Sequence, residues 1–272
     1  MKFIIEKKEK VKQIAVIFNN LKNLSENINI HFTKDGLYTQ GMTSCHCSFF
    51  ELNLADTWFK TYSCPEDSVV GVNCEILFKC ISSLEEGQII IFEYAHGSDK
   101  ILLDFESDKT VSKHFELPLI TIDTENLEVP DVDYYVSDLE LNSDQLNKWV
   151  NQISIFGEEI SIKFEYDNML LSAKSATNGK MEVKMGTTTS WDDKLDLSYG
   201  VEYLRNICHF SKLNNSLELS MGENYPLKIK YDLSIWCDKI EYEDTNPSDV
   251  TCDVELIPDN SIIFYVAPKI ED

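Results

Sequence analysis

The triplet Cys45-His46-Cys47 is the densest group of side chains that could do chemistry, because thiols and imidazoles serve as zinc ligands and nucleophiles. A metal site needs three or four convergent ligands, and a strand would send His46 to the opposite face from the two cysteines. No second cluster of this kind lies within reach in the sequence. We therefore predict no metal, no cofactor and no catalytic residues. A zinc- or cysteine-dependent enzyme on a duplicated α+β scaffold is the alternative from another functional class.

The remaining cysteines lie in apolar or strand-like segments without a repeated CxxC pair, so reduced core thiols are favoured over a disulfide framework. The sequence contains no GxGxxG, phosphate-binding loop or HExxH pattern. Its start, MKFIIEKKEK, lacks a signal-peptide pattern, and no apolar run approaches the roughly 18 residues of a membrane span. We expect an intracellular protein without a membrane partner.

Hydrophobic periodicity predicts strand, helix, strands, helix, strands in the first half of the chain. The predicted helices are Lys7–Leu24 and Val72–Ser83, and the predicted strands are Met1–Glu6, Ile28–Phe32, Leu37–Met42, Cys47–Leu54, Trp58–Ser63, Gln88–Tyr94, Lys100–Phe105 and Thr110–Leu117. The turn Asp35-Gly36 marks a hairpin. The aperiodic stretch Phe115–Tyr134 is predicted to be a surface connector.

The same order returns beyond the connector, with Asp167-Asn168 in the place of Asp35-Gly36 and a shift of 132 residues. The predicted helices are Ser143–Ile155 and Val201–Leu213, and the predicted strands are Tyr134–Glu140, Ile160–Phe164, Met169–Ser172, Met181–Met185, Leu195–Tyr199, Leu217–Met221, Leu227–Leu233 and Ser261–Ala267. We predict an α+β fold of two similar domains, 1–115 and 135–272, joined by the connector 116–134. The helices should cover one face of curved antiparallel sheets.

Charge is distributed unevenly between these elements. The chain of 272 residues has a formal net charge of −23, which argues at first against nucleic-acid binding. The four predicted helices, however, hold nine Lys and Arg residues against four Asp and Glu residues. If they face one way, they form a weakly positive surface suited to loose contact with phosphates. A solvated helix face is the simpler explanation for any single lysine, and an acidic scaffold that binds no DNA is the corresponding alternative.

Four segments carry a more specific signal: SIIFYVAPKIED at the C-terminus, IDTENLEVPDVDY in the connector, DGLYTQGMTSCHCSF in the first half, and VGVN, interpreted as a helix start. Together they closely resemble proliferating cell nuclear antigen, the family of eukaryotic-type DNA sliding clamps. The resemblance covers nearly the whole chain in order. The C-terminal segment is the most specific part and the helices are the least specific. Departures from the family pattern leave a viral as well as a cellular clamp open.

The resemblance implies a homotrimeric ring that encircles duplex DNA without sequence preference, with the helices lining the hole. Such a ring is a processivity factor and docking platform for DNA polymerase and other replication and repair proteins. It is opened by a clamp loader, and it works in the nucleus or, for a viral member, at a cytoplasmic replication site. The alternative within the family is one subunit of a heterotrimeric checkpoint-type ring.

Candidate residues for DNA and for the subunit interface follow from the resemblance. The DNA-binding candidates are Lys7, Lys8, Lys10, Lys12, Lys22, Lys79, Lys148, Arg205, His209 and Lys212. Ala15, Val16, Asn151 and Glu202 stand where the family has basic residues, which shifts weight to the lysines of the first helix. The interface candidates, on two sheet edges that need partners, are Thr110, Val111, His114, Phe115, Lys180, Met181 and Val183.

The family's groove for client peptides lies between the connector and the C-terminal strand. Its implied walls are Met42, His46, Cys47, Phe49, Leu127, Val129, Pro226, Tyr265, Ala267 and Pro268. An apolar pocket with backbone groups beside it suits a peptide with aromatic and aliphatic anchors. The acidic stretch 236–259 interrupts a hairpin that is short in the family. We expect a solvated loop there, flanking the groove and altering which clients bind.

Overall fold

The computed structural model describes residues 1–107, 111–123, 127, 137–223, 225–234 and 259–269, without the side chains of 137–138 and 188–193. The predicted acidic insertion, except Asp259, and most of the predicted connector therefore lie outside the described residues. Within the described part, the fold is antiparallel sheet with four helices, which confirms the predicted α+β class. No helix in these ranges has the length and apolarity that crossing a bilayer requires.

The first half contains two α-helices, one short 3-10 helix and nine strands. The helices are α1 (Lys8–Leu21), η1 (Asp56–Trp58) and α2 (Cys74–Ile81), and the strands are β1 (Lys2–Ile5), β2 (Asn27–Thr33), β3 (Gly36–Met42), β4 (Ser48–Ala55), β5 (Thr61–Ser63), β6 (Ser68–Asn73), β7 (Ile89–Glu93), β8 (Lys100–Glu106) and β9 (Lys113–Pro118). Helix α2 begins late because the Asn73 side chain caps it, accepting a hydrogen bond from the Ile76 amide at 3.1 Å. The predicted helix start VGVN is therefore wrong, since these residues belong to β6.

The second half repeats the alternation of helices and strands. Its elements are β10 (Ser137–Asn142), α3 (Ser143–Ile153), β11 (Glu159–Ser175), β12 (Gly179–Gly200), α4 (Val201–Cys208), β13 (Ser216–Met221), β14 (Leu227–Asp232) and β15 (Ser261–Val266). Asn142 caps α3 as Asn73 caps α2, with 2.9 Å to the Gln145 amide.

Strand β11 differs from the prediction of two strands around Asp167-Asn168. Strand β11 is continuous through these residues. The predicted turn falls at a register irregularity in its pairing with β12, where Tyr166 has φ 55°. Before the irregularity the even positions Ile160 to Phe164 are buried, and after it the odd positions Met169 to Ala173 are. The irregularity therefore changes which side chains face the core without ending the strand.

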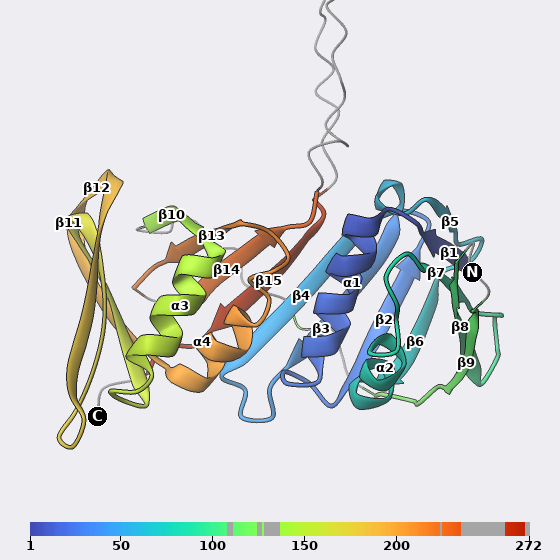
Figure 1. Ribbon diagram of the computed structural model, residues 1–272, viewed down its shortest axis with the longest axis horizontal. Helices are drawn as coiled ribbons and strands as arrows, with labels where there is room; N and C mark the ends of the chain where they lie inside the picture. The colour runs from blue at the N-terminus through green and yellow to red at the C-terminus, as the bar shows by residue number, and fades with distance from the viewer. Residues whose placement is uncertain (108–110, 124–126, 128–136, 224, 235–258, 270–272) are drawn as a thin grey trace, which may run out of the picture.

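One eight-stranded sheet runs through both halves in the order β10-β13-β14-β15-β4-β3-β2-β6. The halves join where β15 pairs antiparallel with β4, from Ser261 opposite Asn53 to Val266 opposite Ser48. All four helices lie on the same side of this sheet (Figure 1). A five-stranded sheet, β5-β1-β7-β8-β9, and the pair β11-β12 complete the fold. Strand β9 extends to Pro118, so residues 116–118 of the predicted connector are strand, as the predicted strand Thr110–Leu117 already had them up to Leu117.

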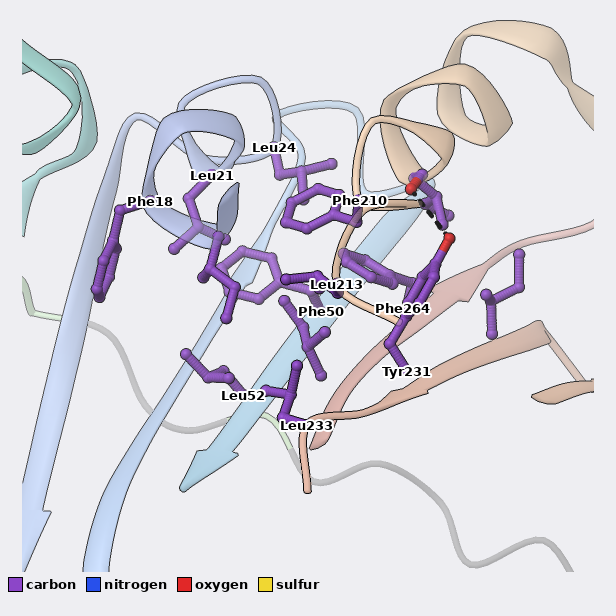
Figure 2. Close-up of a cluster of buried hydrophobic side chains, with 14 of the residues drawn as sticks. Phe18, Leu21, Leu24, Phe50, Leu52, Phe210, Leu213, Tyr231, Leu233 and Phe264 are labelled. Atoms are coloured by element: carbon purple, nitrogen blue, oxygen red, sulfur yellow. Dashed lines mark hydrogen bonds between the residues drawn. The ribbon is translucent and has the colours of Figure 1, made fainter. Parts of the chain in front are cut away.

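A single hydrophobic core continues across the junction of the two halves. Side chains of α1, β4, β14, β15 and the segment after α4 meet in it, and Figure 2 shows Phe18, Leu21, Phe50, Phe210 and Phe264 in this cluster. Hydrogen bonds cross the same junction: Trp58 Nε1 donates to the Leu233 carbonyl at 3.2 Å, and the Ala55 amide donates to Asn260 Oδ1 at 2.8 Å. These contacts hold the helices of both halves on one face.

Candidate functional site

Lys10 of α1, a predicted DNA contact, is buried. Its side chain is 4% exposed, and its ammonium donates to the Trp58 carbonyl at 2.6 Å and lies 5.2 Å from the centre of the Trp58 ring. Helical periodicity places Lys10 beside Val11 and Ile14 at the edge of the apolar stripe, where a long side chain can reach the neighbouring backbone. This burial removes Lys10 from the candidate DNA surface.

Three further lysines, in or directly after the first two helices, form ion pairs with acidic side chains. Lys8 Nζ lies 2.5 Å from Glu86 Oε1, and Glu75 lies 3.7 Å from Lys22 Nζ and 3.9 Å from Lys79 Nζ. The Lys22 ammonium also stands 3.1 Å from the centre of the Phe78 ring. Such exposed pairs add little stability. Their acids nevertheless cancel part of the positive potential at this end of the helix face.

The second half presents its cations differently. Lys148 on α3, Arg205 on α4, His209 at the end of α4, and Lys212 are all exposed. Among the residues with described side chains, no ion pair involves any of these four or Lys12 of α1. We call Lys12 and these four residues the open cations. They are exposed predicted DNA contacts, as Lys7, Lys8 and Lys79 are too, and they differ from Lys8 and Lys79 in having no described ion pair.

On the opposite face of the large sheet, a small apolar cluster is separate from the main core. Phe49 of β4 and Ile263 and Tyr265 of β15 are nearly buried, with Met42 of β3 packed against them. Alternation along β4 explains the separation, since Phe50 and Leu52 face the helices and Phe49 faces away. We call these four residues the outer cluster. Three of them were predicted as groove walls. Ile263 was missed, although its spacing of two from Tyr265 in SIIFYV already placed it on the same face.

Polar groups surround the outer cluster. The Tyr265 hydroxyl donates to Glu51 at 2.8 Å, and the Tyr38 hydroxyl lies 3.4 Å from the other oxygen of that carboxylate. Burial, followed by the Glu51 charge, raises the pKa of Tyr38 to about 12. The Gln40 side chain accepts a hydrogen bond from the Leu127 amide at 3.0 Å, which brings the described part of the connector to β3.

The connector is held to the sheet by its backbone. The Ile120 amide donates to the Gly71 carbonyl at 3.0 Å, and Asn29 Nδ2 donates to the Ile122 carbonyl at 3.2 Å. A Cβ on Gly71 would lie 2.1 Å from the Ile120 oxygen, so this approach requires glycine. Leu127 is 47% exposed, and Val129 lies outside the described residues.

The remaining predicted wall residues lie at the end of β15 and in the turn before β4. The Ala267 amide donates to the Cys47 carbonyl at 2.9 Å, so the C-terminal segment and this turn meet. Ala267 is exposed and Pro268 is half-buried. His46 is exposed and has φ 58°, and Pro226 precedes Leu227, which pairs with Val266. An apolar cavity among the described residues lies elsewhere, inside the core between α1, α2 and the sheets.

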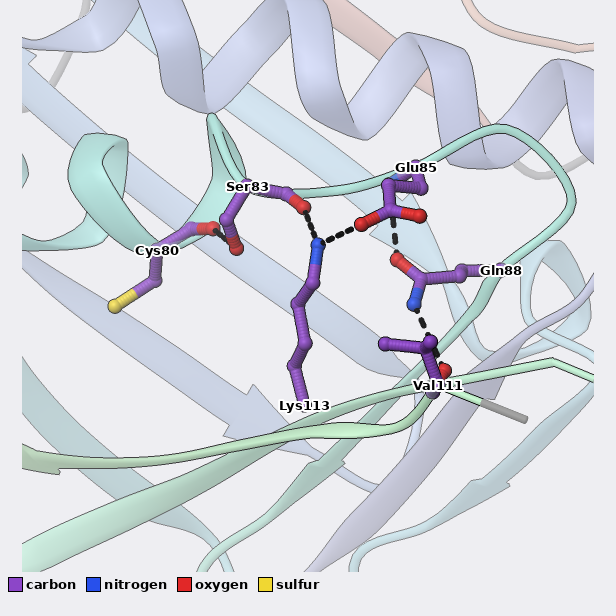
Figure 3. Close-up of polar contacts among 6 residues, drawn as sticks. All are labelled: Cys80, Ser83, Glu85, Gln88, Val111 and Lys113. Carbon is purple, nitrogen blue, oxygen red and sulfur yellow. Dashed lines mark hydrogen bonds and ion pairs between the residues drawn. The ribbon is translucent and has the colours of Figure 1, made fainter. Parts of the chain in front are cut away.

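The predicted interface residues fall on two strand edges. Strand β9 is the last strand of the five-stranded sheet, and its start is tied to the α2–β7 loop, as Figure 3 shows. There Lys113 Nζ donates to the Ser83 carbonyl and pairs with Glu85 at 2.6 Å. The Asp104 carboxylate, hydrogen-bonded to His114, raises the pKa of that imidazole. Val111 is exposed, Phe115 packs on the core, and Thr110 lies outside the described residues.

The second edge belongs to β12. Its residues Lys180, Met181 and Val183 pair with β11 on one side, and the two-stranded sheet contains no other strand. Lys180 is exposed and pairs with Glu182 at 2.7 Å, whereas Met181 and Val183 are half-buried against the core. Among the residues that the structure describes, no further strand pairs with β9 or β12 at these edges.

Metal ligation finds no support at the cysteine triplet. In the described ranges, no three His, Cys, Asp or Glu side chains are grouped so that they could hold a metal ion. His46 lies in a turn and has left-handed backbone, so the strand geometry from which its side chain was predicted to face away from the two cysteines is not present there.

Comparisons with known proteins agree with this geometry. Residues 6–127 match the family model of the proliferating cell nuclear antigen N-terminal domain. Proliferating cell nuclear antigen 1 of Plasmodium falciparum is 24% identical over 268 residues, covering 94% of this chain and 93% of that protein. The protein of that name in Chaetomium thermophilum is 22% identical, with 97% of each chain covered.

A viral protein is similar as well. Probable DNA polymerase sliding clamp 2 of Paramecium bursaria Chlorella virus 1 is 22% identical over 97% of this chain and 89% of its own length. The order of elements, the helices gathered on one face and the matches along almost the whole length support assigning the chain to the proliferating cell nuclear antigen family, to whose members it is similar.

Proposed function

We propose that this protein is a DNA sliding clamp: a homotrimeric ring around duplex DNA that acts as a processivity factor and a docking platform for DNA polymerase and other replication and repair proteins. It performs no catalysis itself. A clamp loader opens the ring, and the ring works in the nucleus or at a viral replication site.

The observation that carries this proposal is the difference between the two faces of the large sheet: one is covered by the helices, and the other carries the outer cluster. The open cations belong to, or directly follow, helices that lie on one face of the large sheet (Figure 1), in a chain whose formal net charge is −23. These cations attract DNA phosphates weakly, which favours DNA inside the ring. The rest of the protein surface is acidic and repels DNA. A closed ring stays on DNA by topology, so each contact can be weak. Weak contacts let the ring slide along the duplex.

Ring closure is supported by the strand edges. Strand β9 and the first part of β12 are different surfaces at opposite ends of the molecule (Figure 1). Their pairing between neighbours is a heterologous contact, which generates a ring when the rotation per subunit closes. Val111 offers apolar area at the first edge, and Met181 and Val183 offer it at the second.

Client docking is supported by the outer cluster. Its apolar side chains lie beside β3, to which the connector residue Leu127 is hydrogen-bonded, and beside the segment that follows β15. A peptide with aromatic and aliphatic anchors can pack on Met42, Ile263 and Tyr265 while its backbone pairs with the adjacent segment. Binding there gives a tethered enzyme a high effective concentration at the DNA.

The test is retention on circular DNA. Purified protein is loaded onto a nicked plasmid with a clamp loader and ATP, and the DNA is separated by gel filtration before and after cutting at one site. We expect protein on the circle and its loss after linearisation, because a ring slides off a free end. Light scattering should give three times 31.3 kDa.

Equal retention on circular and linear DNA would contradict encirclement and indicate ordinary surface binding. A stable monomer that fails to load would favour a subunit of a mixed ring, which addition of the missing subunits would reveal. Blocking both ends of the linear DNA with bound protein serves as the control, since it should restore retention of a true ring.

A further inference from the structure

The turn between β3 and β4 holds two thiols in a fixed arrangement. Thr43 closes the turn: its amide donates to the Ser48 carbonyl at 2.9 Å, and its carbonyl accepts from the His46 amide at 2.8 Å. The left-handed backbone at His46 folds the chain between Cys45 and Cys47, so the two residues lie closer than in an extended strand. The Cys47 thiol turns back and donates to the Cys45 carbonyl at 3.3 Å.

Cys45 is exposed and meets two hydroxyl groups. Its sulfur lies 3.4 Å from Thr43 Oγ1 and 3.0 Å from the Tyr203 hydroxyl, which comes from α4, 158 residues away. As a thiol, Cys45 can donate to one of them. As a thiolate it accepts from both, because hydroxyl hydrogens rotate to suit their partner.

These donors favour the thiolate. The Thr43 hydroxyl, then the Tyr203 hydroxyl, with smaller contributions from the Cys47 amide and thiol, lower the pKa of Cys45 to about 7. The same contacts, first with Cys45 and then with Cys47, raise the pKa of Tyr203, as does the neighbouring Glu202. The Tyr203 hydroxyl, 3.0 Å from the Cys45 sulfur, therefore remains a donor at neutral pH.

The other described cysteines have the opposite environment. Burial raises the pKa of Cys74 and Cys208 to about 12, and it raises the pKa of Cys80 and of the half-buried Cys64 as well. Among these thiols, only Cys45 combines exposure, hydroxyl donors and a second thiol two residues away.

We propose that Cys45 and Cys47 form a peroxide-reactive modification site, in which Cys45 is the reacting thiol and Cys47 the resolving thiol. The Cys45 thiolate attacks one oxygen of hydrogen peroxide, the O–O bond breaks, and the products are Cys45 sulfenic acid and hydroxide. The Cys47 sulfur then attacks the Cys45 sulfur, the S–O bond breaks, and the Cys47 proton leaves with that oxygen as water. The product is a Cys45–Cys47 disulfide, which external thiols reduce.

Oxidation at this site can affect the elements that contact the turn. The Cys47 carbonyl accepts from Ala267 and the Cys45 sulfur touches α4, so the turn connects the end of β15 to the helix face. This inference does not depend on the proposed clamp activity, because the reaction needs only the folded chain and a peroxide.

The test is peptide mapping after treatment with hydrogen peroxide. Cleavage after lysine releases residues 35–60, which contain Cys45 and Cys47 as their only cysteines, and residues 61–79, which contain Cys64 and Cys74. We expect the first peptide to become lighter by two hydrogens and to regain them with a reductant, while the second stays reduced. In C47S, dimedone should trap the sulfenic acid on Cys45, and C45S should show neither product.

Tyr203→Phe is the matched variant for the donor, because it removes only the hydroxyl. Alkylation of Cys45 by iodoacetamide should reach half its maximal rate near pH 7 in the unmodified protein, rising as the thiolate forms. In Y203F the midpoint should move upward, and at neutral pH the rate should fall by about threefold to tenfold.

Three results would overturn the proposal: no mass loss in the 35–60 peptide at peroxide levels that oxidise free thiols, oxidation confined to other cysteines, or an alkylation midpoint equal to that of an ordinary thiol. All readouts use the protein alone, without DNA or clients. Their failure leaves the clamp proposal untouched, and failure of DNA retention leaves this one untouched.

Discussion

The predicted helices of the first half carry six Lys and Arg residues and those of the second half carry three, and the fold treats the two sets differently. In α1 and α2, Lys10 is buried on Trp58, and Glu75 and Glu86 neutralise three other lysines. The second half differs, because its open cations are exposed. They are Lys148 of α3, Arg205 of α4, His209 at the end of α4, and Lys212. A basic residue in a helix is therefore not automatically a DNA contact. Its effect on phosphates depends on which acid or carbonyl the fold places beside it.

The largest expected effect concerns Lys10. Lys10→Met keeps the long apolar stem but removes the donor to the buried Trp58 carbonyl, so the free energy of unfolding should fall by about 1–3 kcal/mol. Urea denaturation followed by circular dichroism measures it. Lys12→Met, an exposed change on the same helix, should stay within about 0.5 kcal/mol. If K10M kept its midpoint and instead weakened DNA binding, Lys10 would belong to the DNA surface after all.

The next effect compares the open and the paired cations directly. We expect Arg205→Ala/Lys212→Ala to weaken binding of a short duplex by about tenfold and to reduce the slope of log affinity against log salt by about two. Lys22→Ala/Lys79→Ala should cost about twofold, because Glu75 already offsets these charges. Fluorescence anisotropy over a salt series gives both quantities. Equal losses from the two double variants would break the comparison between the halves.

The smallest effect runs in the other direction. Glu75→Gln should free Lys22 and Lys79 and tighten duplex binding by about two- to fivefold at low salt, with the gain vanishing as salt rises. Glu218→Gln removes the same charge from β13 and serves as the control. If E75Q and E218Q bound DNA equally well, net charge rather than pairing would govern affinity.

Local features of the fold could be predicted from the sequence. Spacing along α1 and α3, the turn at Asp35-Gly36 and the alternation in β4 and β15 report backbone preference and burial, which act over a few residues. They gave the class and the order of elements, whereas Met42, Phe49 and Tyr265 of the outer cluster were named from the family resemblance. The start of α2 was misplaced because VGVN is apolar enough for either structure, and only the pairing of β6 with β2 makes it a strand.

The sequence by itself determined the order of strands and helices, the positive excess of the helices and the family resemblance at the C-terminus. The tertiary structure alone decided which cations stay open, that Lys10 is buried, and that the Tyr203 hydroxyl lies beside the Cys45 sulfur. The physical reason is range. A helix or strand forms from contacts between near neighbours, whereas the state of a charge or thiol depends on partners that only folding brings within a few ångströms.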